Sequence, residues 1–327
     1  MSQHHKNSRS SSSPPYLWQP GVGPDTRCLE TMRDHFRRPA EPMGEAWFMA
    51  DRRRVFDDLR GNLDDCSLEQ LTRPLGEIAS GNSCFGPMQE WTLWYRYLLA
   101  QLIPRHAERS YESLFQHLVA AFIAVHPRGI EGGYAGFADD AMQTLGRCLM
   151  DPSRWKGDQL AVPAPEDPFA GGRDAAFEWH VACGDSSAAM FLCAKYLPED
   201  DLDSWLGSVF AIRCPKWTTQ IYCWLLDAYP LLSGRVLELA KLVTDAQSEV
   251  VWHGALVLQG DYSGIYTPDR QPLPLLSPSR CDAVLAAAKR HVSEASYFAW
   301  LDGIKQYAYL ETSLGDKPIR FAELLAM

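Results

Sequence analysis

The sequence predicts a predominantly all-α protein made of antiparallel helix hairpins, α-solenoid-like in their stacking, in one large or two packed helical domains. Apolar residues recur with the 3.6-residue period of a helix in at least five segments. Helix start and stop residues flank several of these segments. Between residues 173 and 245 the helices are about 12 to 16 residues long with short connections, which is typical of stacked hairpins.

The clearest helical stripe lies near residue 91. Leu93 and Tyr97 make the opposite side of this helix apolar as well, so we expect it to be buried on all sides. Similar stripes occur within 114–125, 202–210 and 217–228. The residues that form the first stripe, at i, i+3, i+4, i+7 and i+11, are Trp91, Trp94, Tyr95, Leu98 and Leu102.

Local signals mark where these helices begin and end. Ser67 and Gln70 have the spacing of a capping box, in which each side chain accepts a backbone N–H of the other. Proline suits the first position of a helix, and carboxylates suit its first turn. These signals occur at Pro152, Pro215 and Pro278, and at Glu199, Asp200, Asp201 and Asp203, while Gly61, Gly81 and Pro127 are predicted stops.

Composition divides the chain into four parts. Residues 1–24 are rich in Ser and Pro, so we expect a disordered arm, with an export signal as the alternative interpretation. Residues 25–150 and 173–327 are the two predicted helical domains. The Pro- and Gly-rich residues 151–172 between them are a predicted linker or long loop.

The charge balance restricts the class of partner. The chain carries 31 basic and 41 acidic residues, a net charge of −10. An acidic surface repels a phosphate backbone, so nucleic acid is excluded as the expected partner and a basic protein is favoured. No apolar stretch approaches the roughly 20 residues that cross a bilayer, so no membrane partner is expected.

The cysteines indicate a reducing compartment. There are nine, an odd number, without a CxxC pair, and several lie within apolar helical patterns. Free cysteine in such places behaves as a small hydrophobic residue. This pattern argues against a disulfide framework and favours the cytoplasm.

No metal or cofactor motif is complete. The adjacent aspartates at 57–58, 64–65, 139–140 and 200–201 all lack the third aspartate of the DDxxD motif with which class I isoprenoid synthases bind magnesium. His180, Cys183 and Cys193 are potential zinc ligands, but helical His and Cys of this spacing more often face a core. We therefore predict no metal site and no cofactor.

Catalytic and nucleotide templates also fail. The chain has no GxSxG elbow, no GxGxxG and no phosphate-binding loop. Its densest glycine cluster, residues 129–136, follows a predicted helix, so it is interpreted as a loop between helices. Glycine permits close backbone approach, so this loop and residues 151–172 are where we look first for function.

The predicted function is therefore binding. The expected protein is a non-catalytic module, such as an adaptor, inhibitor or antitoxin- or immunity-like protein, whose helical surface binds a specific basic protein. The residues expected to contact that partner are Asp200, Asp201, Asp203 and Trp155.

The alternative is a helical enzyme with an acid–base site at the junction of the two halves. Domain junctions commonly form ligand clefts, and carboxylates with a histidine are suited to proton transfer. The candidate catalytic residues under this hypothesis are His126, Glu131, Asp139 and Asp140.

Overall fold

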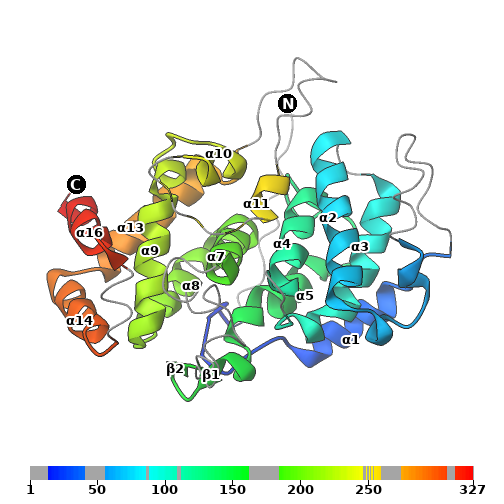
Figure 1. Cartoon of the computed structure of the whole chain (residues 1–327), viewed down its shortest axis with the longest axis horizontal. Coiled ribbons are helices and arrows are strands. Elements are labelled where there is room, and N and C mark those ends of the chain that lie inside the picture. Colours follow the sequence, from blue (N-terminus) through cyan, green and yellow to red (C-terminus); the bar gives the residue numbers. More distant parts are fainter. Residues whose placement is uncertain are drawn as a thin grey trace.

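The predicted all-α class is confirmed. The computed structural model describes residues 14–40, 56–85, 88–108, 112–161, 184–245, 248, 250, 252, 254–258, 274–307 and 314–326. Within them the only sheet is a two-stranded hairpin of β1 (Trp155–Lys156) and β2 (Gln159–Leu160), which are antiparallel (Figure 1). The α-helices of the described residues are α1 (Thr26–His35), α2 (Leu68–Phe85), α3 (Gln89–Leu102), α4 (Leu114–Val125), α5 (Phe137–Thr144), α7 (Gly184–Tyr196), α8 (Glu199–Ala211), α9 (Pro215–Leu232), α10 (Leu239–Val243), α11 (Gly254–Val257), α13 (Pro278–His291), α14 (Glu294–Ile304) and α16 (Lys317–Ala326).

The described helices form two groups that pack side by side. Helices α1–α5 lie on the right of Figure 1, and α7–α10, α13, α14 and α16 lie on the left. At the junction α4 contacts α7, and α11 contacts α10 of the second group and α2 and α4 of the first. In the first group α4 packs against α2 and α3, and α1 packs against α5 and α3. In the second group α9 is central, and α7, α13, α14 and α16 all contact it.

The predicted caps are present. Ser67 and Gln70 form the reciprocal capping-box bonds, with the Ser67 N–H 2.8 Å from Gln70 Oε1. Pro215 and Pro278 begin α9 and α13. The stripe on α3 is buried as expected, but Leu93 is 47% exposed, so the prediction that α3 is buried on all sides is wrong. In the described residues we find no helix with both the length and the apolar character to cross a membrane.

Gly81 is not a helix stop. Helix α2 continues through it to Phe85, and a Cβ atom at Gly81 would lie 1.9 Å from a ring carbon of Trp91 on α3. The glycine is therefore explained by close packing of α2 against the indole and not by a helix end.

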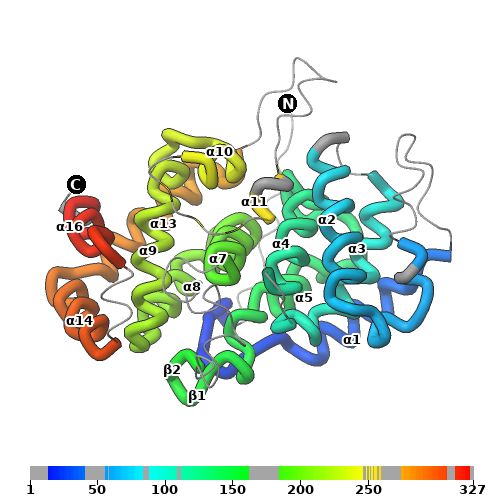
Figure 2. Tube along the Cα trace, viewed as in Figure 1, coloured from blue at the N-terminus to red at the C-terminus, as the bar shows by residue number. Residues whose placement is uncertain are grey.

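Residues 14–24 are not the disordered arm that composition predicts; residues 1–13 lie outside the described part. Tyr16 and Trp18 are only 3% and 2% exposed. The Trp18 indole donates to the carbonyl of Gly146 at 2.9 Å, and its backbone N–H donates to Ser208 Oγ at 2.8 Å. The segment, deep blue in Figure 2, thus connects the two groups of helices. Burial of the two large aromatic side chains stabilises an ordered conformation of this segment despite the polar residues around them.

Residues 151–161, the described part of the predicted linker, form a packed hairpin. Trp155 pairs with Leu160 across the strands, and its indole donates to the carbonyl of Leu149 at 2.9 Å. The Trp155 ring also lies 5.6 Å from that of Trp217 on α9. These contacts attach the hairpin to both groups of helices.

A buried carboxylate lies where the two groups meet. Asp185, in the first turn of α7, is fully buried. It accepts hydrogen bonds from Ser113 Oγ at 2.6 Å, Gln116 Nε2 at 2.7 Å and Arg154 Nη1 at 2.7 Å. Because Gln116 belongs to α4 and Arg154 precedes the hairpin, one carboxylate holds three segments together. One cluster of buried apolar side chains also runs through both groups.

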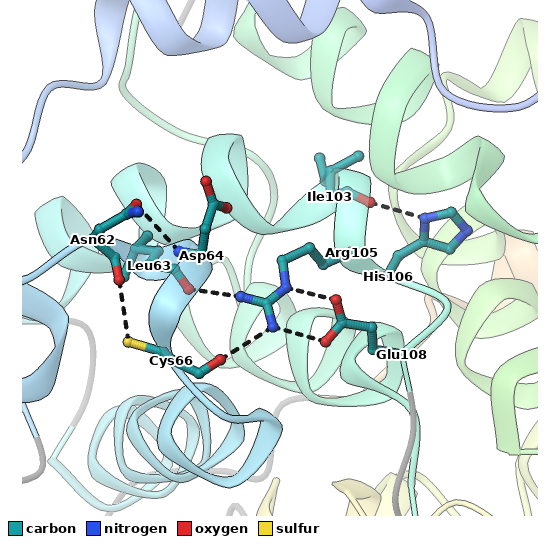
Figure 3. Close-up of polar contacts among 8 residues, drawn as sticks. All are labelled: Asn62, Leu63, Asp64, Cys66, Ile103, Arg105, His106 and Glu108. Atoms are coloured by element: carbon teal, nitrogen blue, oxygen red, sulfur yellow. Dashed lines mark hydrogen bonds and ion pairs between the residues drawn. The ribbon is translucent and has the colours of Figure 1, made fainter.

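Arg105 makes a comparable connection within the first group (Figure 3). Its guanidinium donates to the carbonyls of Leu63 at 2.6 Å and Cys66 at 3.2 Å, and forms a two-pronged ion pair with Glu108. The pair raises the pKa of Arg105 and lowers that of Glu108. These contacts occupy the guanidinium of Arg105 with groups of the chain itself. We therefore interpret the cluster as structural: it attaches the segment before α2 to the end of α3.

Candidate functional site

An open cleft of about 610 Å³ lies between α1 and the glycine-rich loop that leads into α5. The loop is one of the two places where the sequence directs attention, and Asp140 is one of the predicted acid–base residues. The residues that line the cleft are Asp25, Arg27, Cys28, Thr31, His35, Tyr134, Ala135, Gly136 and Asp140.

Helix α1 contributes one wall because it is amphipathic. Its apolar side chains Leu29 and Met32 are buried toward α5 and α3. Its other face carries Cys28, Thr31 and His35 at i, i+3 and i+7, which a helix places in one row. Asp25 caps the helix by accepting the backbone N–H of Cys28 at 2.9 Å, so the cleft begins at the cap of α1.

The glycine loop contributes the opposite wall. Three glycines of the loop have positive φ angles, which residues with a side chain rarely adopt: 71° at Gly132, 89° at Gly133 and 100° at Gly136. Arg96 Nη2 donates to the carbonyl of Glu131 at 2.6 Å, and a Cβ at Gly132 would lie 2.9 Å from that nitrogen. Glycine therefore allows the loop to turn tightly over Arg96 and to present Tyr134 to α1.

The two walls meet at a pair of aromatic rings. His35 and Tyr134 are stacked, with centroids 4.0 Å apart and an interplanar angle of 22°. His35 Nδ1 lies 2.9 Å from the carbonyl oxygen of Thr31. A carbonyl only accepts, so Nδ1 carries the hydrogen, and in the neutral ring Nε2 is an acceptor.

The polar groups of the cleft hold one another in defined protonation states. The Tyr134 hydroxyl donates to Asp140. Burial, reinforced by Asp140, raises the pKa of Tyr134. Burial and the neighbouring carboxylates of Asp140 and Asp25 raise the pKa of Cys28 to about 12. The backbone N–H of Cys28 lowers the pKa of Asp25. At neutral pH the thiol and the phenol are therefore neutral, and Asp25 is anionic.

This arrangement is suited to recognition of a cation. The thiolate is the nucleophilic form of cysteine, and a pKa of about 12 keeps Cys28 out of that form at neutral pH. Two carboxylates beside an aromatic wall provide attraction for positive charge and a surface on which it can stack.

The four predicted acid–base residues do not share one pocket. His126 is only 3% exposed and lies against Phe122 and Phe137, with ring centroids 4.9 and 5.9 Å away. Burial and, to a smaller extent, Arg96 lower the pKa of His126 to about 3. The side chains of Glu131 and Asp139 are exposed. Of the four, Asp140 lines the cleft.

The residues predicted to contact a partner are also separate from the cleft. Trp155 is only 7% exposed and packs in the core of the chain, and its role as a partner contact stays a prediction. Asp200 is exposed, Asp203 pairs with Arg290, and Asp201 accepts the backbone N–H of Tyr16 at 3.4 Å. A partner role for these three aspartates stays a prediction.

Of the three possible zinc ligands, only Cys193 lies in the described part of the chain. His180 and Cys183 lie outside the described residues, and Cys193 is fully buried in α7. Throughout the part of the chain that the structure describes, no three His, Cys, Asp or Glu side chains converge as metal ligands would.

The sequence indicates only one wall of the cleft, the glycine loop with Asp140. The polar residues of the other wall, Asp25, Cys28 and His35 beside and on α1, are not predicted from the sequence. The available signal was the polar row at i, i+3 and i+7, which is indistinguishable in sequence from an ordinary solvated helix face.

Comparisons with known proteins identify no family for the chain. No protein-family model matches it, and searches of curated proteins and of solved structures likewise return no match.

Proposed function

We propose that this chain is a non-catalytic protein-binding module, an adaptor, inhibitor or antitoxin- or immunity-like protein, that binds a specific basic protein through its helical surface. The observation that carries the proposal is the cleft beside α1. Its carboxylates and aromatic rings suit recognition of positive charge, while its thiol and phenol are neutral at physiological pH.

The overall charge supports the same partner class. A net charge of −10 favours encounter with a basic protein through long-range attraction, which accelerates association more than it raises affinity. Binding should therefore weaken as salt is added, because exposed charges are screened over about 8–10 Å at 0.1–0.15 M salt.

We place this activity in the cytoplasm. Six buried cysteines of the described chain form no disulfide: Cys66, Cys148, Cys193, Cys214, Cys223 and Cys281. Buried cysteines outside disulfides suit a compartment that keeps cysteine reduced.

The test is affinity purification of the full chain from its native host, followed by mass spectrometry. We expect one basic protein at near-stoichiometric ratio, released as salt is raised. An unrelated acidic helical protein of similar net charge serves as the control bait and should not recover it. A chain that is recovered alone, carrying a small molecule, would contradict the proposal and favour the helical enzyme.

A further inference from the structure

We propose that the cleft between α1 and the glycine loop binds the guanidinium group of an arginine side chain presented by the partner. This inference rests on the proposed function and assigns it a place on the molecule. The geometry points to this ligand through three features: carboxylates, an aromatic wall and an additional ring acceptor.

The carboxylates supply the charge complement. Asp140 and Asp25 both line the cleft, and both carboxylates help to raise the pKa of the Cys28 thiol. Asp25 Oδ1 is used by the cap of α1, and Asp140 Oδ2 by Tyr134. A carboxylate has about four acceptor sites, so both keep acceptor capacity for the N–H groups of a ligand.

The aromatic wall distinguishes guanidinium from ammonium. A guanidinium is planar and weakly hydrated, so it stacks on rings while its edge donates to carboxylates. The His35–Tyr134 stack borders the same cleft as the two aspartates. His35 Nε2, an acceptor in the neutral ring, adds a third group that can receive an N–H. Arginine therefore fits the cleft better than lysine.

One residue of the cleft opposes this ligand. Arg27 is exposed at the first turn of α1 and brings positive charge to the cleft. A cation in the first turn is also unfavourable to the helix dipole. Removal of this charge should therefore strengthen binding of a cation without loss of stability. The proposal can thus be tested by a variant that raises affinity as well as by one that lowers it.

The experiment titrates the full chain with an N-acetylated, amidated tetra-arginine peptide by calorimetry in 50 mM salt. We expect Asp140→Asn to weaken binding about tenfold, since one charged hydrogen-bonded contact is worth roughly 1.4 kcal/mol or more. Arg27→Gln should tighten binding by about two- to fivefold. A tetra-lysine peptide should bind more weakly than tetra-arginine.

The control is Asp302→Asn on α14, an exposed aspartate paired with Lys305. It changes the net charge by the same amount as Asp140→Asn and should leave binding unchanged. Thermal unfolding verifies that each variant is folded. Equal weakening by the two Asp→Asn variants, or no binding by the unsubstituted chain, would overturn the assignment. If the native partner is captured equally well by Asp140→Asn, the cleft is excluded while the proposed function stands; if no basic protein is captured, the proposed function itself fails.

Discussion

Asp185 on α7 is a single carboxylate that receives three donors from two other segments, the start of α4 and the residues before the hairpin. Removing a charge from water costs several kcal/mol, and good geometry is needed to offset that cost. Here Ser113, Gln116 and Arg154 supply donors at 2.6–2.7 Å, and the side chain of Asp185 has no exposure to solvent. The carboxylate is therefore tied closely to the packing of α4 against α7.

Replacing Asp185 by Ala should destabilise the protein by about 3–5 kcal/mol, because it breaks a buried ion pair with Arg154 and removes the carboxylate that accepts from Ser113 and Gln116. The matched control is Asp203→Ala, which breaks an exposed pair with Arg290 and should cost less than about 1 kcal/mol. Urea unfolding of both variants measures the difference. Similar losses for the two would show that burial of Asp185 does not determine its contribution.

His126 makes stability depend on pH. Its pKa falls from the ordinary 6.5 to about 3 in the folded chain. The unfolded state then binds the proton more readily between these values, so stability is lost as the pH falls from 6.5 toward 3. Above pH 6.5 the ring is neutral in both states and contributes no slope.

The variant His126→Leu should remove this dependence. Between pH 7 and pH 4.5, the unsubstituted chain should lose about 2–3 kcal/mol more of its unfolding free energy than the variant does. Urea unfolding at the two pH values gives the comparison. Parallel losses in the two proteins would contradict the assignment of the slope to His126.

Helix α2 contains two glycines at which an added Cβ should have opposite effects on stability. At one the effect comes from packing against another helix, and at the other from helix propensity. Gly81 faces the Trp91 indole, whereas a Cβ at Gly76 would meet no atom within 4 Å. We expect Gly81→Ala to cost about 1–3 kcal/mol through overpacking and Gly76→Ala to stabilise by about 0.5–1 kcal/mol. Thermal or urea unfolding distinguishes them, and two changes of the same sign would contradict this account.

The segment 14–24 acts as a connection between the two groups of helices. Trp18 packs edge-on against Trp205 on α8 and Trp217 on α9, and its indole bonds to Gly146 in the first group. Trp18→Ala should therefore cost about 3–5 kcal/mol of unfolding free energy. Leu17→Ala is the control, since Leu17 is 40% exposed and should cost about 0.5 kcal/mol or less. A small loss for Trp18→Ala would mean that the segment is not part of the cooperative core.

Local signals in the sequence predicted the elements well, because caps and apolar stripes act over a few residues. Ser67, Gln70, Pro215 and Pro278 all take their expected positions. Gly81 was misleading because its reason is a contact with another helix.

The remaining differences between the predicted and the observed structure come from contacts between residues far apart in the sequence. Trp18 and Trp155 lie in Pro-rich, polar surroundings, and the indoles that bury them come from residues 205 and 217. No local pattern encodes such partners. The same holds for Asp185, whose donors lie about 30 or more residues away along the chain, beyond any helical period.

For the molecule as a whole, the two groups of helices meet through α4 and α7, the segment 14–24 and the Asp185 contacts. The cleft lies within the first group, between α1 and α5, and not at this junction. The sequence indicated Asp140 and the glycine loop, but it could not indicate that Asp25, Cys28 and His35 would face them. That juxtaposition arises from the packing of α1 against α5.

Binding of a cationic side chain in the cleft between α1 and the glycine loop should protect the backbone of both walls. The most direct measurement is amide hydrogen exchange of the full chain with and without the tetra-arginine peptide, read by mass spectrometry. We expect the peptide to slow exchange in segments 25–35 and 129–140. This slowing should be absent in Asp140→Asn and retained in Asp302→Asn. Unchanged exchange in both segments, or slowing confined to another surface such as the acidic start of α8, would contradict binding in this cleft.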